Sequence, residues 1–153
     1  YDISNHSCFD VIEGSTSLLT LDSSLVSDQR TLGFATKNHW RQMGIEVHKQ
    51  VTIEGMEGRQ NAGIINVIRG QRVLYPIGEV EFTTREKVDV DILILSRRCR
   101  SSIEQLAERF DMGLIILDSS IPGYRLAALV EGCVQTSTPY RNVAEEGAFV
   151  REF

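Results

Sequence analysis

Residues 92–95 form an uninterrupted run of isoleucine and leucine, and this run constrains the fold more than any other feature of the sequence. It ends the segment 88–96, and a continuous apolar run is typical of a strand that is covered on both faces. A stretch with helical periodicity, a second apolar strand at residues 113–118 and a second helical stretch follow it. The order strand, helix, strand, helix predicts adjacent parallel strands with right-handed crossovers, and therefore an α/β fold.

Sequence signals mark the ends of these two helices. Ser101 followed by Glu104 predicts a capping box at the start of the first helix. Pro122 stands where the second helix is expected to begin, and Gly132 is expected to end it. The apolar stripe of the first helix is expected to consist of Ile103, Leu106, Ala107 and Phe110.

Two β-hairpins are predicted in the first half of the chain. Residues 8–12 and 16–22 flank one glycine-containing turn, and residues 64–68 and 72–76 flank another. The second hairpin is expected to end at Pro76, because proline cannot donate to a continuing ladder.

Between the hairpins the sequence predicts a helix, a strand and a loop. Apolar residues recur at roughly helical intervals over residues 23–44, so we expect a helix there that is broken or bent near Gly33. Residues 45–53 place apolar side chains on one side of an extended strand, and the glycine-rich, charged segment 54–63 indicates a loop. A final strand is predicted at residues 147–150.

The chain length sets the expected organisation. A chain of 153 residues is the size of one domain with one core, so residues 1–153 are expected to form a single domain. No stretch reaches the apolar length that a membrane span needs, and we expect the chain to be soluble. It begins with Tyr1 and lacks the features of a secretion signal, which indicates a piece of a larger protein.

Charge and cysteine content limit the classes of function. A formal net charge of -5 argues against a surface that binds phosphate backbones throughout, although it is compatible with a local basic patch. Cys8, Cys99 and Cys133 form no C-x-x-C pair, so they predict neither a zinc ribbon nor a redox motif. We interpret them as small buried hydrophobic residues, and the sequence leaves open whether two of them pair.

No sequence motif announces a catalytic centre. His6, His39 and His48 lack metal-binding spacings such as H-x-H-x-D-H, and the chain has no G-x-S-x-G elbow, Walker loop or dinucleotide fingerprint. Ser119 and Ser120 lie at the carboxyl end of a predicted strand, where α/β folds often place sites, but turn chemistry explains them better. The sequence therefore predicts no catalytic residue, no metal ligand, no cofactor and no identifiable small-molecule substrate.

One cluster of cations lies between a predicted strand and a predicted helix. Arg97, Arg98 and Arg100 precede the helix that is expected to open at Ser101, where free N–H groups favour anions. These four residues are candidate phosphate-binding residues. The alternative, which we favour, is a solvated turn whose arginines pair with Asp118 or Glu104.

Two carboxylates alternate on one face of the strand that precedes this cluster. Asp89 and Asp91 have the spacing of a pair that could act as acid and base or hold a cation. Two exposed residues at the entrance of a strand explain them equally well.

The order of elements in the last third resembles the carboxyl-terminal part of ComEC-type DNA-internalisation proteins. Residues 8–12 and 16–22 resemble the opening hairpin of that domain, and residues 1–7 resemble its preceding strand. The likeness is closest to shortened Bacteroidetes-type members, and it implies a metallo-β-lactamase-like fold with mixed β-sheets and flanking helices. The segments that carry it in the last third are residues 88–96, the helix from Ser101, residues 113–118, the second helix, Pro139, Tyr140 and residues 146–150.

The departures from the family pattern concern the metal ligands. Where metal-binding members carry a histidine pair followed by Gly-Ser after the buried strand, residues 97–101 read Arg-Arg-Cys-Arg-Ser. The family's H-x-H-x-D-H segment is expected after the opening hairpin, but residues 23–44 contain only His39. The resemblance therefore implies a degenerate domain to which no catalytic residue can be carried over.

The resemblance also implies a place for the chain in the cell. The parent would be a multi-spanning inner-membrane protein that passes single-stranded DNA across the membrane during transformation. This chain would be the soluble part of that protein on the periplasmic side. Its expected partners are the membrane channel of the same polypeptide and single-stranded DNA. A purely structural or protein-docking module is a second hypothesis, and a residual metal-dependent hydrolase is a third. The residues expected to contact phosphate are Arg97, Arg98, Arg100 and Ser101, with Arg69 and Arg72 as further candidates.

Overall fold

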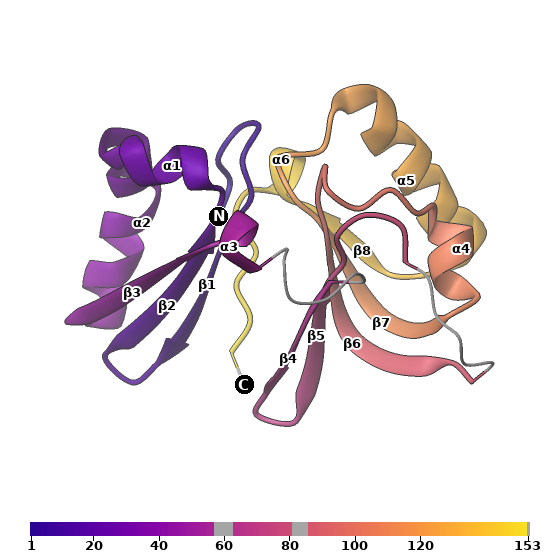
Figure 1. Ribbon diagram of the computed structural model, residues 1–153, viewed down its shortest axis with the longest axis horizontal. Helices are drawn as coiled ribbons and strands as arrows, with labels where there is room; N and C mark the ends of the chain where they lie inside the picture. The colour runs from indigo at the N-terminus through magenta and orange to yellow at the C-terminus, as the bar shows by residue number, and fades with distance from the viewer. Residues whose placement is uncertain (57–62, 81–85, 153) are drawn as a thin grey trace.

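The computed structural model describes residues 1–56, 63–80 and 86–152, which form two β-sheets with helices on their outer faces (Figure 1). The first sheet has the strand order β1-β2-β3. β1 and β2 are antiparallel and form the first predicted hairpin, whereas β3 pairs parallel to β2 after a helical crossover. The bounds of these strands are Cys8–Glu13 for β1, Thr16–Leu21 for β2 and Val47–Thr52 for β3.

The second sheet has the strand order β4-β5-β6-β7-β8. β4 and β5 form the second predicted hairpin, and all other neighbours in this sheet are parallel. The predicted parallel pairing of the two apolar strands, β6 and β7, is therefore confirmed. The bounds are Ile64–Ile68 for β4, Gln71–Tyr75 for β5, Val88–Leu95 for β6, Phe110–Leu117 for β7 and Tyr140–Asn142 for β8.

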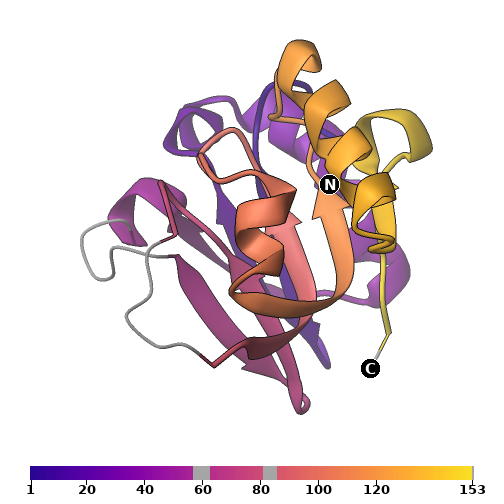
Figure 2. The same ribbon diagram turned by 90° about the vertical axis from the view of Figure 1, so that its right-hand side faces the viewer.

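Four helices cover the outer faces of the sheets. α1 and α2 lie against the first sheet, and α4 and α5 lie against the second, in front of β6 and β7 in Figure 2. The helices α3 and α6 are short turns that follow β3 and β8 directly. The mixed sheets and flanking helices confirm the predicted α/β fold class. The helices span Ser23–Ser27 (α1), Gln29–Met43 (α2), Ile53–Met56 (α3), Ile103–Ala107 (α4), Gly123–Gln135 (α5) and Val143–Glu146 (α6).

Separate apolar clusters hold each sheet to its neighbours. The largest joins β6 and β7 to α4 and α5 and includes Leu93, Leu106 and Leu129. A second joins the first sheet to α1 and α2 and includes Leu21 and Leu32. A third covers the opposite face of the second sheet, and its members are Val73, Ile92, Ile116 and Val143 with Ile68, Ile94, Leu114 and Phe149 at its edge. Because β6 and β7 carry buried residues on both faces, their apolar runs are explained.

The helical region after the first hairpin breaks at Asp28, so the prediction of a break near Gly33 is wrong. The side chain of Asp28 accepts a hydrogen bond from the backbone N–H of Thr31 at 3.1 Å and so caps α2. Gly33 lies inside α2, whose inner face is held by buried Leu32 and Thr36. Packing of this face outweighs the small helix penalty of one glycine.

The helix after β6 begins one residue later than predicted. Its capping box is formed by Ser102 and Gln105, and the helix α4 spans only Ile103–Ala107. Ser101 does not cap it, because its hydroxyl accepts the backbone N–H of Val80 at 3.1 Å. Phe110, predicted on the helical stripe, is instead the first residue of β7.

Gly132 does not end α5, which continues to Gln135. A Cβ atom at Gly132 would lie 2.8 Å from the Cβ of Ile103, so α4 and α5 touch at this position. The glycine signal therefore reports close helix packing and not a helix end.

Both ends of the chain differ from prediction. Residues 147–150 contain no strand, and Phe149 packs against the third apolar cluster from an irregular segment. Residues 1–7 contain only an isolated bridge between Ile3 and His6 in place of the expected strand. In the predicted loop 54–63, residues 57–62 lie outside the described residues.

The structure also bears on the cysteines and on membrane insertion. Cys8, Cys99 and Cys133 are buried free thiols, which confirms their interpretation as small buried residues. Burial raises the pKa of each of these thiols. Within the described residues, no helix combines the length and the apolar character that crossing a bilayer requires.

Candidate functional site

Polar side chains gather where β2, β5, β6 and β7 reach their carboxyl ends. β5, β6 and β7 are parallel, so their carboxyl ends share one edge of the second sheet. Hydrogen bonds connect this edge to the end of β2 and the start of β1 in the first sheet. We call this group the strand-end cluster, and it consists of Ser7, Asp22, Tyr75, Ser96, Arg97, Arg98, Asp118 and Ser120.

Asp22, directly after β2, is the charged centre of the cluster and is 0% exposed. Its carboxylate accepts a hydrogen bond from the backbone N–H of Ser7 at 2.9 Å. The guanidinium of Arg98 donates to Oδ1 at 2.9 Å, and that of Arg97 reaches Oδ2 at 3.4 Å. A buried carboxylate needs such compensation, because an unpaired charge in the interior is strongly destabilising.

Arg98 binds a second carboxylate, that of Glu54 in α3. Glu54 also accepts the backbone N–H of Ser23 at 2.9 Å. Burial raises the pKa of Glu54, but its backbone hydrogen bonds and the charge of Arg98 outweigh burial, so the pKa lies below its ordinary value. Arg98 therefore connects the turn after β6 to the carboxyl ends of the parallel strands β2 and β3.

Asp118, directly after β7, is the hydrogen-bond acceptor of a group of hydroxyls in the other half of the cluster. Its carboxyl group accepts hydrogen bonds from the hydroxyls of Ser7 and Ser120, each at 2.5 Å, and from the backbone N–H of Ser120 at 2.9 Å. The hydroxyl of Tyr75 donates to Ser7 at 3.1 Å. Burial raises the pKa of Asp118 to about 6, although the serine hydrogen bonds oppose the increase.

The predicted phosphate-binding residues lie in different surroundings. Arg97 and Arg98 form ion pairs with Asp22. The alternative from the sequence, a turn whose arginines pair with Asp118 or Glu104, named other partners. Ser101 is buried. The side chain of Arg100 is exposed and has no hydrogen-bond partner among the described residues. Of these four predicted residues, Arg100 alone presents its charge to solvent without a carboxylate partner among the described residues, and its contact with phosphate stays a prediction.

Arg69 and Arg72, the further candidates for phosphate contact, lie at the hairpin of β4 and β5. Arg72 donates its backbone N–H to Asp91 at 2.7 Å and forms an ion pair with Asp89 at 3.4 Å. Both aspartates of β6 therefore bind the same arginine on the neighbouring strand β5. Arg69 lies in the turn between β4 and β5 with a positive φ of 47°.

The donor set of the strand-end cluster does not fit a metal centre. Within the described ranges, no three side chains of the types His, Cys, Asp and Glu converge on one point. His6 is the nearest imidazole, with Nδ1 3.8 Å from Asp22 and 3.2 Å from the hydroxyl of Ser24. The oxygens of Asp22 that a cation would use accept hydrogen bonds from Ser7, Arg97 and Arg98.

Comparison with known protein families decides where the chain belongs. The family model of the ComEC C-terminal domain matches residues 1–153. The chain belongs to the ComEC C-terminal domain family. Comparison with curated proteins and with solved structures finds no match. The match confirms the resemblance stated from the sequence and associates this ComEC domain with a membrane protein of competence and DNA uptake.

Sequence reasoning missed the two carboxylates that bind Arg98 in this ComEC domain. Asp22 was assigned only to the end of a strand, and Glu54 only to a loop. Both contact Arg98 across 76 and 44 residues of sequence, respectively. The one available signal was a carboxylate that follows an apolar strand directly, a pattern that Asp22 shares with Asp118.

Proposed function

We propose that this chain is a non-catalytic, metallo-β-lactamase-like domain on the periplasmic side of a ComEC DNA-uptake protein, where it contacts single-stranded DNA. On this proposal residues 1–153 act as one domain beside the membrane channel of the same polypeptide. The family match and the two mixed sheets with outer helices support the proposal.

The observation that carries the proposal is the pairing of Asp22 with two arginines. Asp22 is fully buried, and the guanidinium groups of Arg97 and Arg98 supply the positive charge that a metal ion supplies to a carboxylate in a metallohydrolase. The hydroxyls of Ser7 and Ser120 are also buried and already bound to Asp118. A substrate therefore meets no exposed nucleophile in this cluster.

Contact with DNA is assigned to Arg100. The backbone N–H of Arg100 donates to the carbonyl of Gly78 at 2.8 Å, and the preceding residue, Cys99, is buried, so the backbone at Arg100 is held in place. The side chain is exposed, and an arginine held in this way suits a phosphate contact. Arg97 and Arg98 support this turn from inside by their bonds to Asp22.

Titration with a labelled oligonucleotide tests the contact. Arg100→Glu should weaken binding at low salt, and loss of one phosphate contact should reduce the salt dependence of log K by about 0.7. Lys87→Glu is the matched control, because Lys87 is exposed and the charge change is identical. Equal binding by both variants and the unchanged chain would remove Arg100 from the proposal.

The ion pairs of Arg98 also favour a second candidate function. They join Asp22 of the first sheet, Glu54 of α3 and the turn after β6, so they stabilise the contact between the sheets. This is what a purely structural or docking module requires. Failure of the chain to bind oligonucleotide at any salt concentration would favour this candidate.

A further inference from the structure

The outward face of α2 carries a row of basic residues around one exposed aromatic ring. Arg30, Phe34, Lys37 and Arg41 follow one another at spacings of four, three and four residues, so they lie on one side of the helix. All four are exposed. The opposite side of α2 is buried against the first sheet. The four residues form what we call the α2 basic face.

The charge of this face opposes that of the whole chain. The formal net charge is -5, but α2 contains three cations and no carboxylate. Among the described residues, none of Arg30, Lys37 and Arg41 forms an ion pair with a carboxylate. The nearest acidic residue in sequence, Asp28, is bound to the backbone of Thr31 as the helix cap. The three cations are therefore available to an anionic partner.

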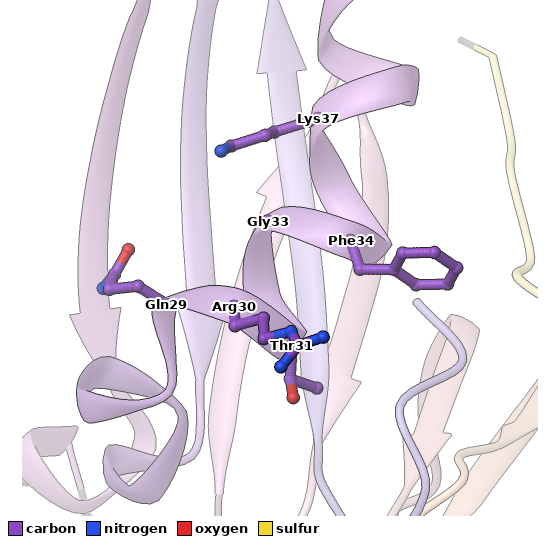
Figure 3. Close-up of a pocket in the computed structure, with 6 residues that line it drawn as sticks. All are labelled: Gln29, Arg30, Thr31, Gly33, Phe34 and Lys37. Atoms are coloured by element: carbon purple, nitrogen blue, oxygen red, sulfur yellow. The ribbon is translucent and has the colours of Figure 1, made fainter.

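Phe34 is 91% exposed. With so little of its surface covered, the ring contributes little to the packing of α2 against the first sheet, and its face is open to a partner. Figure 3 shows the ring projecting from α2. The ring borders an open hollow of about 490 Å³. The absence of a side chain at Gly33 leaves room there, with the stem of Lys37 alongside, and the lining residues are Gln29, Arg30, Thr31, Gly33, Phe34 and Lys37.

We propose that the α2 basic face binds single-stranded nucleic acid, with a base stacked on Phe34 and phosphates bound by Arg30, Lys37 and Arg41. An exposed ring suits unpaired bases, because every base has a π face, and clustered cations follow the backbone. The distance along the helix from Arg30 to Arg41 is about 16 Å, which spans several phosphates. Duplex DNA does not offer its base faces to such a ring.

An anionic membrane is the competing partner, and the face is poorly suited to it. A helix that lies in a membrane interface buries a broad apolar face. Elsewhere on α2, Leu32 and Trp40 pack toward the first sheet, and Met43 is exposed in the last turn, outside the α2 basic face. The α2 basic face itself offers one apolar side chain, Phe34, so stacking with a base uses it better than insertion into lipid.

The α2 basic face is separate from the contact proposed for Arg100. Arg100 lies in the turn after β6 of the second sheet, whereas α2 covers the first sheet (Figure 1). The inference rests on the proposed contact with single-stranded DNA, but the two surfaces are tested by different variants. If Arg100→Glu has no effect but the α2 variants do, only the Arg100 contact is wrong.

Fluorescence anisotropy with labelled oligothymidylate tests the α2 basic face. Phe34→Ala should lower the affinity roughly five- to a hundredfold, the range expected for loss of one stacked base. Phe34→Leu should lower it equally, because leucine keeps an apolar side chain but has no π face. Replacing Arg30, Lys37 and Arg41 together by Gln should reduce the salt dependence of log K by about 2.

The matched control replaces Lys49, Lys87 and Arg151 by Gln, which removes the same charge from exposed positions on other segments. It should leave the affinity and its salt dependence close to those of the unchanged chain. The proposal is overturned if the Phe34 variants bind like the unchanged chain, or if the control weakens binding as much as the α2 triple variant. It is also overturned if Phe34 is needed for sedimentation with phosphatidylglycerol vesicles and not for oligonucleotide binding.

Discussion

Replacing Asp118 by asparagine isolates the contribution of one buried carboxyl group to stability. Asp118 is 8% exposed, and burial raises its pKa from an ordinary 3.8 to about 6. Between these two values the folded chain keeps the proton on Asp118, while the unfolded chain has released it. The folded state therefore binds more protons in this range, and the free energy of unfolding falls as the pH rises.

The size of the effect follows from the two pKa values. A difference of one pKa unit corresponds to about 1.4 kcal/mol, so Asp118 should lower the free energy of unfolding by about 2–3 kcal/mol between pH 4 and pH 7. Asparagine has nearly the same shape and does not titrate. Its oxygen can still accept the N–H of Ser120, and its amide can donate to the hydroxyl of Ser7. The free energy of unfolding of Asp118→Asn, taken relative to that of the unchanged chain, should therefore increase by about 2–3 kcal/mol from pH 4 to pH 7.

Urea unfolding followed by circular dichroism at several pH values between 4 and 7 measures this difference. Asp111→Asn is the control, because Asp111 is an exposed carboxylate of the same strand. Its stability should follow that of the unchanged chain at every pH. If Asp118→Asn also runs parallel to the unchanged chain, Asp118 does not hold a proton in the folded state and the reasoning fails.

Three further predictions concern packing and charge. Arg98→Ala should destabilise the chain by about 3–5 kcal/mol in urea unfolding, because it leaves buried Asp22 without its closest guanidinium, whereas the same change at Arg100 should cost little. Gly132→Ala should lower the free energy of unfolding by about 1–3 kcal/mol, since its Cβ would lie 2.8 Å from Ile103, and an unchanged melting temperature would show that α4 and α5 adjust freely. The three cysteines should react with a thiol reagent only at the rate of unfolding, because they are buried and burial raises their pKa; rapid labelling of the folded chain would contradict this.

The sequence predicted the strands better than the helix ends. The two hairpins and the β6–β7 pair were predicted because alternation, turn glycines and apolar runs are local signals. The start of α4 was misplaced because Ser101 and Ser102 both satisfy a capping pattern. Only the tertiary bond from Val80 to Ser101 decides between them. Gly132 likewise looked like a helix end until its contact with Ile103 was known.

The strand-end cluster was predicted only in part for the same reason. Arg97, Arg98 and Ser120 were placed at the carboxyl ends of strands, where α/β folds collect polar groups. Their partner Asp22 lies in the other sheet, and no local pattern brings it to Arg98. The exposed Phe34 was also beyond sequence reasoning, because its position on α2 depends on which face of the helix packs against the first sheet.

The central claim is that arginine side chains, and not a metal ion, balance the buried carboxylate of the strand-end cluster. The most direct test incubates the chain with labelled single-stranded DNA and Mn²⁺ or Zn²⁺, and measures cleavage together with the metal retained after gel filtration. We expect no cleavage above that of free metal and no stoichiometric metal. Cleavage that depends on bound metal and disappears in Asp22→Asn or Asp118→Asn would contradict the account.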